Sequence, residues 1–398
     1  MVKDKKNIIV RLIGRFLRTC DRVRIYYMKR TCRLDKRVMV FISRPDYSDN
    51  GRALYEFLCK SGYGDKYMIY WIVKDPSNCM KMFPDSKAVF LKAYNWLGLP
   101  NQKALKIYMS AGTALVTHAF FLAKKDSLSG QKRIMLWHGC GYKDKVWKKF
   151  IPYNYDKACV AGPLFIKTKM KYWGLPEDRI IAKGYPRYDW MLHPSNAAKQ
   201  MLDNLKGNHK KLIIWMPTFR NAYGFKEKGI SSFPLMKNQQ DWEDLDNFCI
   251  QLSICILVKL HMYQADYKIN FETLTNVKII SNNDFDKMQV KLYEFLALTD
   301  GLISDYSSVS VDYLLVNKPI AYALDDFEMY KSMRGFVFEN PLKYMPGHHL
   351  YNLNDLKIFL KDCSEGKDVY KERRSEMMDI AIYKSDNYCL DVLKALDL

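Results

Sequence analysis

Residues 301–319, GLISDYSSVSVDYLLVNKP, carry polar groups directly after a predicted buried strand. The strand GLIS ends at Asp305, and Ser307 and Ser308 follow in a short turn before a predicted helix. The free N–H groups of a helix N-terminus, together with two hydroxyls, suit an anionic phosphate. The alternative is that an Asp or Ser here only caps its own helix. The turn is therefore a candidate phosphate site.

A histidine ends another predicted strand, RIMLWH (133–138). A parallel strand delivers its last side chain to the ligand-binding edge of the sheet. The following glycines, Gly139 and Gly141, leave room for a ligand and permit unusual backbone angles. A neutral imidazole near pH 7 can take a proton from an attacking hydroxyl. His138 is thus a candidate general base, and a histidine that merely caps a turn is the alternative.

Cationic and hydroxyl side chains follow two predicted strands of the second half. Lys259 and His261 alternate in CILVKLH, so they share one side of a strand end and can hold a phosphate oxygen. Thr218 and Arg220 follow LIIWMP, and the arginine fork suits a diphosphate. A solvated strand terminus is the alternative for the lysine–histidine pair.

A turn enforced by Gly and Pro lies in KGYPRYD (183–189). It displays Arg187 and Asp189 near the predicted connector between two halves of the chain. These two residues are candidates for acceptor binding or for an interdomain contact. A structural Arg187–Asp189 ion pair is the alternative.

Apolar runs that alternate with helical patterns position these side chains. The predicted strands are 38–43, 68–73, 88–91, 113–118, 133–138, 159–161, 180–182, 212–217, 255–260, 277–280, 301–304 and 319–324. The predicted helices of the second half are 241–253, 286–298, 307–316 and 326–332. Continuous apolar strands separated by helices imply parallel sheets covered on both faces. With 398 residues, too many for one ordinary core, the chain is expected to be an α/β protein of two Rossmann-like domains facing across a cleft. The expected divisions are 1–37, 38–200, 201–375 and a C-terminal helix at 376–398.

The first 37 residues are strongly basic. They hold 13 Lys or Arg against three Asp, a net charge of +10 out of +20 for the chain. Helical spacing places apolar residues on one stripe, namely Ile9, Ile13, Phe16, Cys20, Val23 and Tyr27. The arginines Arg11, Arg15, Arg18 and Arg22 lie off that stripe. A basic amphipathic helix of this kind fits an anionic membrane surface. Packing on its own domain and binding of nucleic acid are the alternatives.

Several other classes of protein and site lack support in the sequence. No apolar segment resembles a signal peptide or a membrane span. No G-x-G-x-x-G fingerprint or Walker loop suggests dinucleotide or ATP binding. The ten cysteines form no C-x-x-C pair or zinc-spaced cluster, so structural zinc is not expected and a reducing cytoplasm is the simplest compartment. No nucleic-acid motif is present, and aromatic residues are not interleaved with the basic run as stacking platforms.

Five ordered motifs resemble the CDP-glycerol glycerophosphotransferase family, membrane-peripheral enzymes that prime and polymerise teichoic acids and related capsular polyol-phosphate chains. The motifs are WHGCGYKDK (137–145), KGYPRYD, WMPTFR (215–220), VKLH (258–261) and the block from 301 to MRGFVFENP (333–341). The resemblance implies a glycosyltransferase-B-like fold, with the acceptor on the N-terminal half and the CDP-alditol on the C-terminal half.

The resemblance also implies roles for individual residues. His138 corresponds to the proposed base of the family's His-Gly-Thr motif, and His261 to a second histidine near the donor phosphates. Ser307 and Ser308 correspond to the hydroxyl pair that holds the diphosphate, and Arg334 to the Arg of an Arg-Gly element. The chain departs from the family pattern at three positions, which are Cys140 in place of Thr, Met262 in place of Pro and Tyr188 in place of Asn.

The expected activity is transfer of glycerol-phosphate or ribitol-phosphate from a CDP-alditol to a hydroxyl of a lipid-linked primer or growing polymer, with release of CMP. Gly139, Thr218, Arg220, Lys259 and Asp305 are expected beside the donor. The expected place of action is the cytoplasmic face of a bacterial membrane. No dedicated metal site is expected, although a loosely held Mg²⁺ on the diphosphate is compatible with the sequence. The alternatives are a glycosyltransferase of the same fold and a non-catalytic basic protein that binds polyanions.

Overall fold

The computed structural model describes residues 17, 19–144, 155–218, 233–260 and 269–398. The chain forms two compact units. Unit 1 comprises Met1–His138, Pro152–Cys159 and Leu396–Leu398, and unit 2 comprises Gly139–Ile151 and Val160–Ala395.

The division between the units differs from the boundary expected near residue 200. Residues 160–395 belong to unit 2, and backbone hydrogen bonds tie the first of them to later parts of that unit. Val160 N–H donates to the carbonyl of Ile181 (2.9 Å), and Tyr383 N–H donates to that of Ala161 (2.9 Å).

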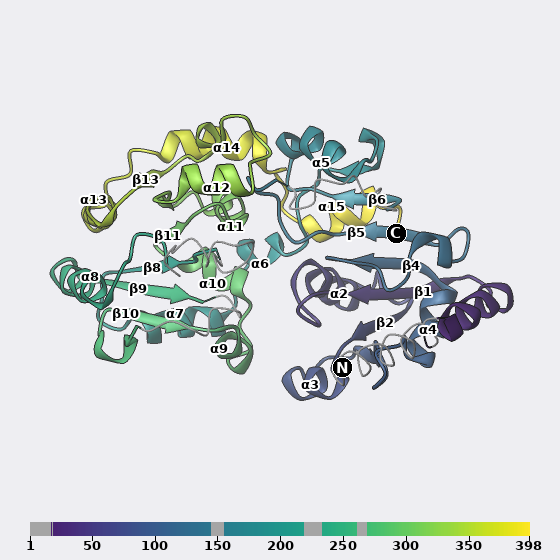
Figure 1. The fold of residues 1–398 in the computed structure, drawn as a ribbon. Coiled ribbons are helices and arrows are strands. Elements are labelled where there is room, and N and C mark those ends of the chain that lie inside the picture. Colours follow the sequence, from purple (N-terminus) through teal and green to yellow (C-terminus); the bar gives the residue numbers. More distant parts are fainter. Residues whose placement is uncertain (1–16, 18, 145–154, 219–232, 261–268) are drawn as a thin grey trace, which may run out of the picture. The chain divides into compact units, whose positions relative to one another are not determined.

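Unit 1 alternates strands with helices (Figure 1). Its elements are β1 (Asp35–Ile42), α2 (Asp49–Ser61), β2 (Met68–Val73), α3 (Pro76–Met82), β3 (Val89–Lys92), α4 (Gln102–Ser110), β4 (Ala111–Val116), η1 (Lys124–Asp126), β5 (Lys132–Met135) and β6 (Lys157–Cys159). A helix that covers residues 19–31 precedes β1.

Unit 2 begins with short elements and continues with a second alternating set. The first are η2 (Pro163–Phe165), α5 (Ile166–Trp173), η3 (Glu177–Arg179), β7 (Ile180–Ile181), α6 (Tyr188–Leu192) and α7 (Asn196–Lys206). The second set is β8 (Lys211–Trp215), α8 (Gln239–Leu252), β9 (Ile254–Lys259), η5 (Phe271–Thr273), β10 (Val277–Ile280), α9 (Asn282–Lys287), α10 (Leu292–Leu298), β11 (Gly301–Ser304), α11 (Val309–Asp312), η6 (Tyr313–Val316), β12 (Ile320–Ala323), α12 (Phe327–Met333), η7 (Pro341–Tyr344), β13 (His348–Leu350), α13 (Leu353–Glu365), α14 (Lys371–Ala381) and α15 (Tyr388–Ala395).

The strands of both units follow the doubly wound order. The six strands in unit 1 run β3-β2-β1-β4-β5-β6, and those of the second sheet run β10-β9-β8-β11-β12-β13, with parallel pairing throughout. In each sheet, the second and third strands are added on one side of the first strand, and the later strands are added on its other side. This reversal creates a switch point between β1 and β4 and another between β8 and β11, where open α/β sheets bind ligands. The prediction of two Rossmann-like α/β domains is confirmed.

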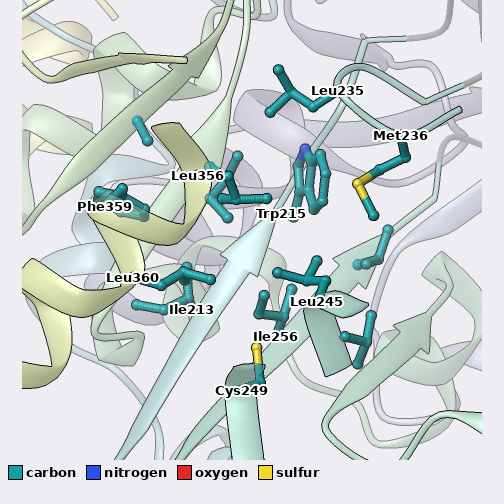
Figure 2. Packing of buried hydrophobic residues seen from close by; sticks show 14 of the residues in the cluster. Ile213, Trp215, Leu235, Met236, Leu245, Cys249, Ile256, Leu356, Phe359 and Leu360 are labelled. Carbon is teal, nitrogen blue, oxygen red and sulfur yellow. The ribbon is translucent and has the colours of Figure 1, made fainter. Parts of the chain in front are cut away.

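Apolar strands and capped helices build the core of unit 2. Figure 2 shows Leu356, Phe359 and Leu360 of α13 beside Ile213 of β8, and Leu245 and Cys249 of α8 form part of the same buried cluster. Helix α13 starts where the Asn352 side chain accepts from Asp355 N–H and ends at Gly366, whose φ is 72°. These caps set the ends of α13, and burial of the apolar residues of α8 and α13 turns those faces toward the sheet.

The helix at residues 19–31 packs on the buried cluster of unit 1 through Ile25 and Met28, and Cys32 just beyond the helix contacts the same cluster. Arg24 also donates to the Pro100 carbonyl (2.6 Å). The described part of the predicted stripe points elsewhere, since Val23 and Tyr27 are 63% and 67% exposed. The stripe residues Ile9, Ile13 and Phe16 lie outside the described residues.

Candidate functional site

His138 lies two residues beyond Leu136, which continues β5, and the chain passes from unit 1 to unit 2 at the next peptide bond. Its Nδ1 is 3.2 Å from the Thr117 carbonyl oxygen. A carbonyl only accepts, so this hydrogen bond requires the proton on Nδ1 and leaves Nε2 with its lone pair. Nε2 is thus the atom that can take a proton.

Two aromatic groups contact the His138 ring. The His118 ring lies parallel to it, with centroids 4.1 Å apart and an interplanar angle of 6°. The Trp137 ring is also 4.1 Å away, at 38°. Asn50 holds Trp137 in its left-handed backbone conformation (φ 61°) by donating to its carbonyl (2.9 Å). Sequence reasoning missed His118, although the histidine at the end of the predicted strand TALVTH was a visible signal.

The two glycines after His138 lie against Ser308 in unit 2. A Cβ at Gly139 would be 2.4 Å from Ser308 Oγ, and one at Gly141 would be 3.1 Å from Ser308 Cα. Gly139 also has a φ of 138°. Within unit 2, the structure therefore places Gly139 and Gly141 directly on the predicted phosphate turn, and only glycine fits at position 139.

The Ser307–Ser308 turn is not an ordinary helix cap. Ser308 is the first residue before α11, but its side chain makes no capping hydrogen bond. Helix α11 has only four residues and continues as the 3₁₀ turn η6, so it is shorter than the predicted 307–316 helix. Both serines are partly exposed. The Ser308 hydroxyl is therefore not used as a helix cap, and the short helix has a weaker dipole than expected.

Asp305 ties the switch-point strands together. Its carboxylate accepts from Thr218 N–H (2.7 Å), Thr218 Oγ1 (2.5 Å) and Ser307 N–H (3.1 Å). Lys143 donates to Thr218 Oγ1 (2.9 Å) from the loop that begins at Gly139. Because its oxygens accept these bonds, Asp305 fixes the shape of the site. Lys143 brings a cation that sequence reasoning had not selected.

Arg334 follows α12 beside the same loop. Asp144 N–H donates to the Gly335 carbonyl (3.2 Å), and Val337 N–H donates to that of Tyr142 (2.8 Å). This antiparallel pairing joins the loop after Gly139 to the Arg-Gly element. Figure 1 places α12 and α11 in the same part of unit 2.

Lys259 ends β9, the strand next to β8, and is 8% exposed. Its ammonium donates to Asn282 Oδ1 (2.7 Å). Burial lowers the pKa of Lys259 to about 8, although nearby Asp286 opposes the shift. The ammonium therefore lies at the ligand-binding edge of the second sheet and titrates near physiological pH.

Arg187 and Asp189 do not pair with each other. Arg187 Nη2 binds Asp312 (2.7 Å), and Tyr188 and Tyr293 donate to the same carboxylate (2.5 and 2.7 Å). Burial raises the pKa of Asp312, and the charge of Arg187 is the main opposing influence. Asp189 instead accepts from the N–H groups of Tyr388 and Cys389 at the start of α15 (2.6 and 2.9 Å). The alternative of a structural Arg187–Asp189 ion pair is thus wrong, because each side chain binds residues that lie more than 100 positions away in the sequence.

Two predicted site residues, Arg220 and His261, lie outside the described residues, as does Met262. Within the part of the chain that the structure describes, no three His, Cys, Asp or Glu side chains gather as a metal site would require. No helix in that part has both the length and the apolar character needed to cross a bilayer.

Curated relatives carry teichoic acid names. The chain is 26% identical over 226 residues to the teichoic acid ribitol-phosphate primase of Bacillus spizizenii, covering 52% of this chain and 54% of that protein. It is 27% identical over 355 residues to the ribitol-phosphate polymerase TarL of Staphylococcus aureus, covering 85% and 58%. The glycerol-phosphate primase of Bacillus subtilis is 24% identical over 345 residues, covering 81% and 82%. The chain thus spans little more than half the length of the first two.

Solved structures show the same fold. The wall teichoic acid polymerase TagF has a TM-score of 0.71 at 20% identity, covering 92% of this chain and 89% of that one. A UDP-GlcNAc 2-epimerase from Neisseria meningitidis has a TM-score of 0.53 at 12% identity, covering 91% and 99%. The family model described as CDP-Glycerol:Poly(glycerophosphate) glycerophosphotransferase matches residues 24–388, and the chain belongs to that family.

Proposed function

We propose that this protein transfers glycerol-phosphate or ribitol-phosphate from a CDP-alditol to a hydroxyl of a primer or growing polyol-phosphate polymer, and releases CMP. The observation that carries this proposal is the contact of Gly139 with Ser308. The residue after the candidate base thereby lies on the turn whose hydroxyls suit a diphosphate. Family membership and the names of the relatives support the same chemistry.

The donor is assigned to the switch point of the second sheet. Ser307 and Ser308 are assigned to bind the diphosphate through their hydroxyls, and Lys143, Lys259 and Arg334 are assigned as its cationic contacts. These groups stabilise charge on the transferred phosphate and on departing CMP. Arg220 and His261 are assigned to the donor by the family resemblance alone.

His138 is assigned as the general base. Its Nε2 takes the proton of the acceptor hydroxyl while the oxygen attacks phosphorus, in keeping with the Nδ1 bond to the Thr117 carbonyl. Arg187 and Asp189, which were candidates for acceptor binding, are assigned structural roles because backbone or buried side-chain groups occupy both.

The membrane is proposed as the place of action, on its cytoplasmic face. The helix at 19–31 binds unit 1 through one side and exposes Val23, Tyr26 and Tyr27, which are 63%, 55% and 67% accessible. Exposed aromatic and apolar groups beside arginines suit an anionic lipid interface. We expect the protein to sediment with anionic liposomes less well as salt rises, and the Val23→Ser, Tyr27→Ser variant to lose binding. Equal sedimentation of wild type and variant contradicts this assignment.

The activity is tested by incubating the protein with CDP-glycerol or CDP-ribitol and a lipid-linked glycerol-phosphate primer, and measuring CMP. Wild type should release CMP with one donor and form a phosphodiester product. His138→Ala should lose about 100-fold or more in kcat, as expected for a general base, and keep its donor affinity. His193→Ala is the matched control, since His193 is exposed and outside the proposed site. A glycosidic product from a nucleotide-sugar, or full activity of His138→Ala, contradicts the proposal.

A further inference from the structure

The pair formed by His118 and His138 has a defined origin in unit 1. β4 and β5 are neighbouring parallel strands, with Val116 opposite Met135. His118 follows the end of β4, and His138 follows the end of β5, so both reach the same edge of the sheet. Both residues are partly exposed, whereas Thr117 between the strand and His118 is fully buried.

Thr117 holds both rings through different atoms. Its backbone carbonyl oxygen lies 3.2 Å from His138 Nδ1, and its hydroxyl lies 2.9 Å from His118 Nδ1. The two rings are then nearly parallel, at 6° and 4.1 Å between centroids. A single buried residue therefore fixes the position of one ring and places a second flat ring against its face.

We propose that His118 is a positioning residue that keeps His138 oriented for proton acceptance. The parallel ring limits rotation of the His138 imidazole and keeps Nδ1 on the Thr117 carbonyl, so that Nε2 stays free of hydrogen. This inference rests on the proposed function, in which His138 is the base.

The reaction step shows what this orientation controls. The acceptor oxygen forms a bond to the alditol-bearing phosphorus, and the bond from that phosphorus to the bridging oxygen breaks, leaving its electron pair on CMP. The acceptor proton moves to His138 Nε2 and later passes to solvent. A ring rotated away from the acceptor loses this transfer, and displacement of a catalytic group by about 1 Å can cost about 100-fold in rate.

The first test combines substitutions with steady-state kinetics. His118→Ala should lower kcat by about 10-fold to 100-fold and leave the KM for the CDP-alditol unchanged. His118→Phe keeps a flat ring and should retain activity within a few-fold of wild type. In the His138→Ala background, His118→Ala should add no further loss, because its effect passes through His138. Wild-type activity of His118→Ala, no recovery with Phe, or a further loss in that background overturns the proposal.

A second measurement separates failure of this inference from failure of the proposed function. Long-range ¹⁵N–¹H spectra of the full chain report which nitrogen of each histidine carries hydrogen. The His138 signal should show hydrogen on Nδ1 in wild type and in His118→Phe, and a mixture of tautomers in His118→Ala. An unchanged His138 tautomer in His118→Ala overturns the positioning role even if CMP release is absent. A changed tautomer without any CMP release supports positioning and refutes the proposed reaction.

Discussion

At the scale of single residues, hydrogen bonds decide what the Asp305 carboxylate of the candidate donor site can do. Asp305 carries a negative charge where an anionic donor is proposed, yet its oxygens bind Thr218 and the Ser307 backbone. Carboxylates that accept several N–H and O–H bonds have those lone pairs engaged. Asp305 thus fixes the geometry of the site, and Lys143, which donates to Thr218 Oγ1, adds a cation to the same hydrogen-bond network.

Lys259 gives a pH-dependent prediction. Its pKa of about 8 means that the ammonium is present below pH 8 and lost above it. Affinity for CDP-glycerol, measured by calorimetry between pH 6.5 and 9.5, should therefore fall as pH rises through about 8. The Lys259→Met variant should bind CDP-glycerol more weakly than wild type, and its affinity should not change with pH in this range. A flat affinity profile for wild type would remove Lys259 from the donor site.

The same lowered pKa of Lys259 makes the free energy of unfolding rise with pH, whereas the expected donor affinity falls. The unfolded lysine keeps its proton up to about 10.5, whereas the folded one releases it near 8, so the unfolded state binds more protons in between. The free energy of unfolding from this residue therefore rises with pH between 8 and 10.5.

At the scale of elements, the path of the segment that starts at Gly139 requires a residue without a side chain at that position. Gly139→Ala should destabilise unit 2 by about 1–3 kcal/mol through overpacking against Ser308, in addition to the cost of its positive φ. Gly98→Ala is the matched control, because Gly98 has a φ of 73° but no atom within 4 Å of a built Cβ. Urea unfolding and donor binding of the two variants should differ, with binding lost only at position 139. Equal behaviour of both would mean that the loop moves aside.

The buried Arg187–Asp312 pair joins the turn before α6 to α11. Removing one partner leaves an uncompensated charge, so Arg187→Met should lower the free energy of unfolding by about 3–5 kcal/mol. The surface pair of Lys384 and Asp379 is a control, since both side chains are more than half exposed, and Lys384→Ala should cost about 1 kcal/mol or less. Chemical denaturation measures both. A small loss at Arg187 would show that the tyrosine hydroxyls alone stabilise Asp312.

The sequence predicted elements best where local pattern and burial agree. The strands 68–73, 277–280 and 301–304 match β2, β10 and β11, because apolar runs of this length fit a buried parallel strand. The short β13 was missed, since His348 and His349 break the apolar run. The long helix expected at 286–298 is two helices, α9 and α10, separated by residues 288–291.

The candidate site was predicted less completely, because its partners come from distant segments. The strand-end rule selected His138, Lys259 and the serine turn as candidates, and each of them lies at or just after the end of a strand in the structure. It could not find the Arg187–Asp312 pair, which spans 125 positions. Nor could it pair Lys143 with Thr218, because that contact depends on a loop path that no local pattern encodes.

At the scale of the whole molecule, one face of the N-terminal helix should stabilise unit 1, and the other face should be free to bind lipid. Ile25→Ala and Met28→Ala should each lower the free energy of unfolding by about 1–3 kcal/mol, because these side chains pack on the unit 1 cluster. Val23→Ala should change stability by less than about 0.5 kcal/mol, since its side chain is exposed. Deletion of residues 1–35 removes both groups together and cannot separate them. Similar losses at all three positions would contradict this division.

The route of the chain has a consequence for synthesis on the ribosome. Unit 1 takes its first residues from the beginning of the sequence, strand β6 from residues 157–159, and Leu396–Leu398 from beyond α15. There Asp397 accepts from Lys157 (2.8 Å), and its carbonyl accepts from Lys132 (2.9 Å). Almost all of unit 2 is therefore translated before unit 1 receives the contacts of Leu396–Leu398. A nascent chain stopped anywhere within unit 2 would present an unfinished first unit to chaperones and proteases.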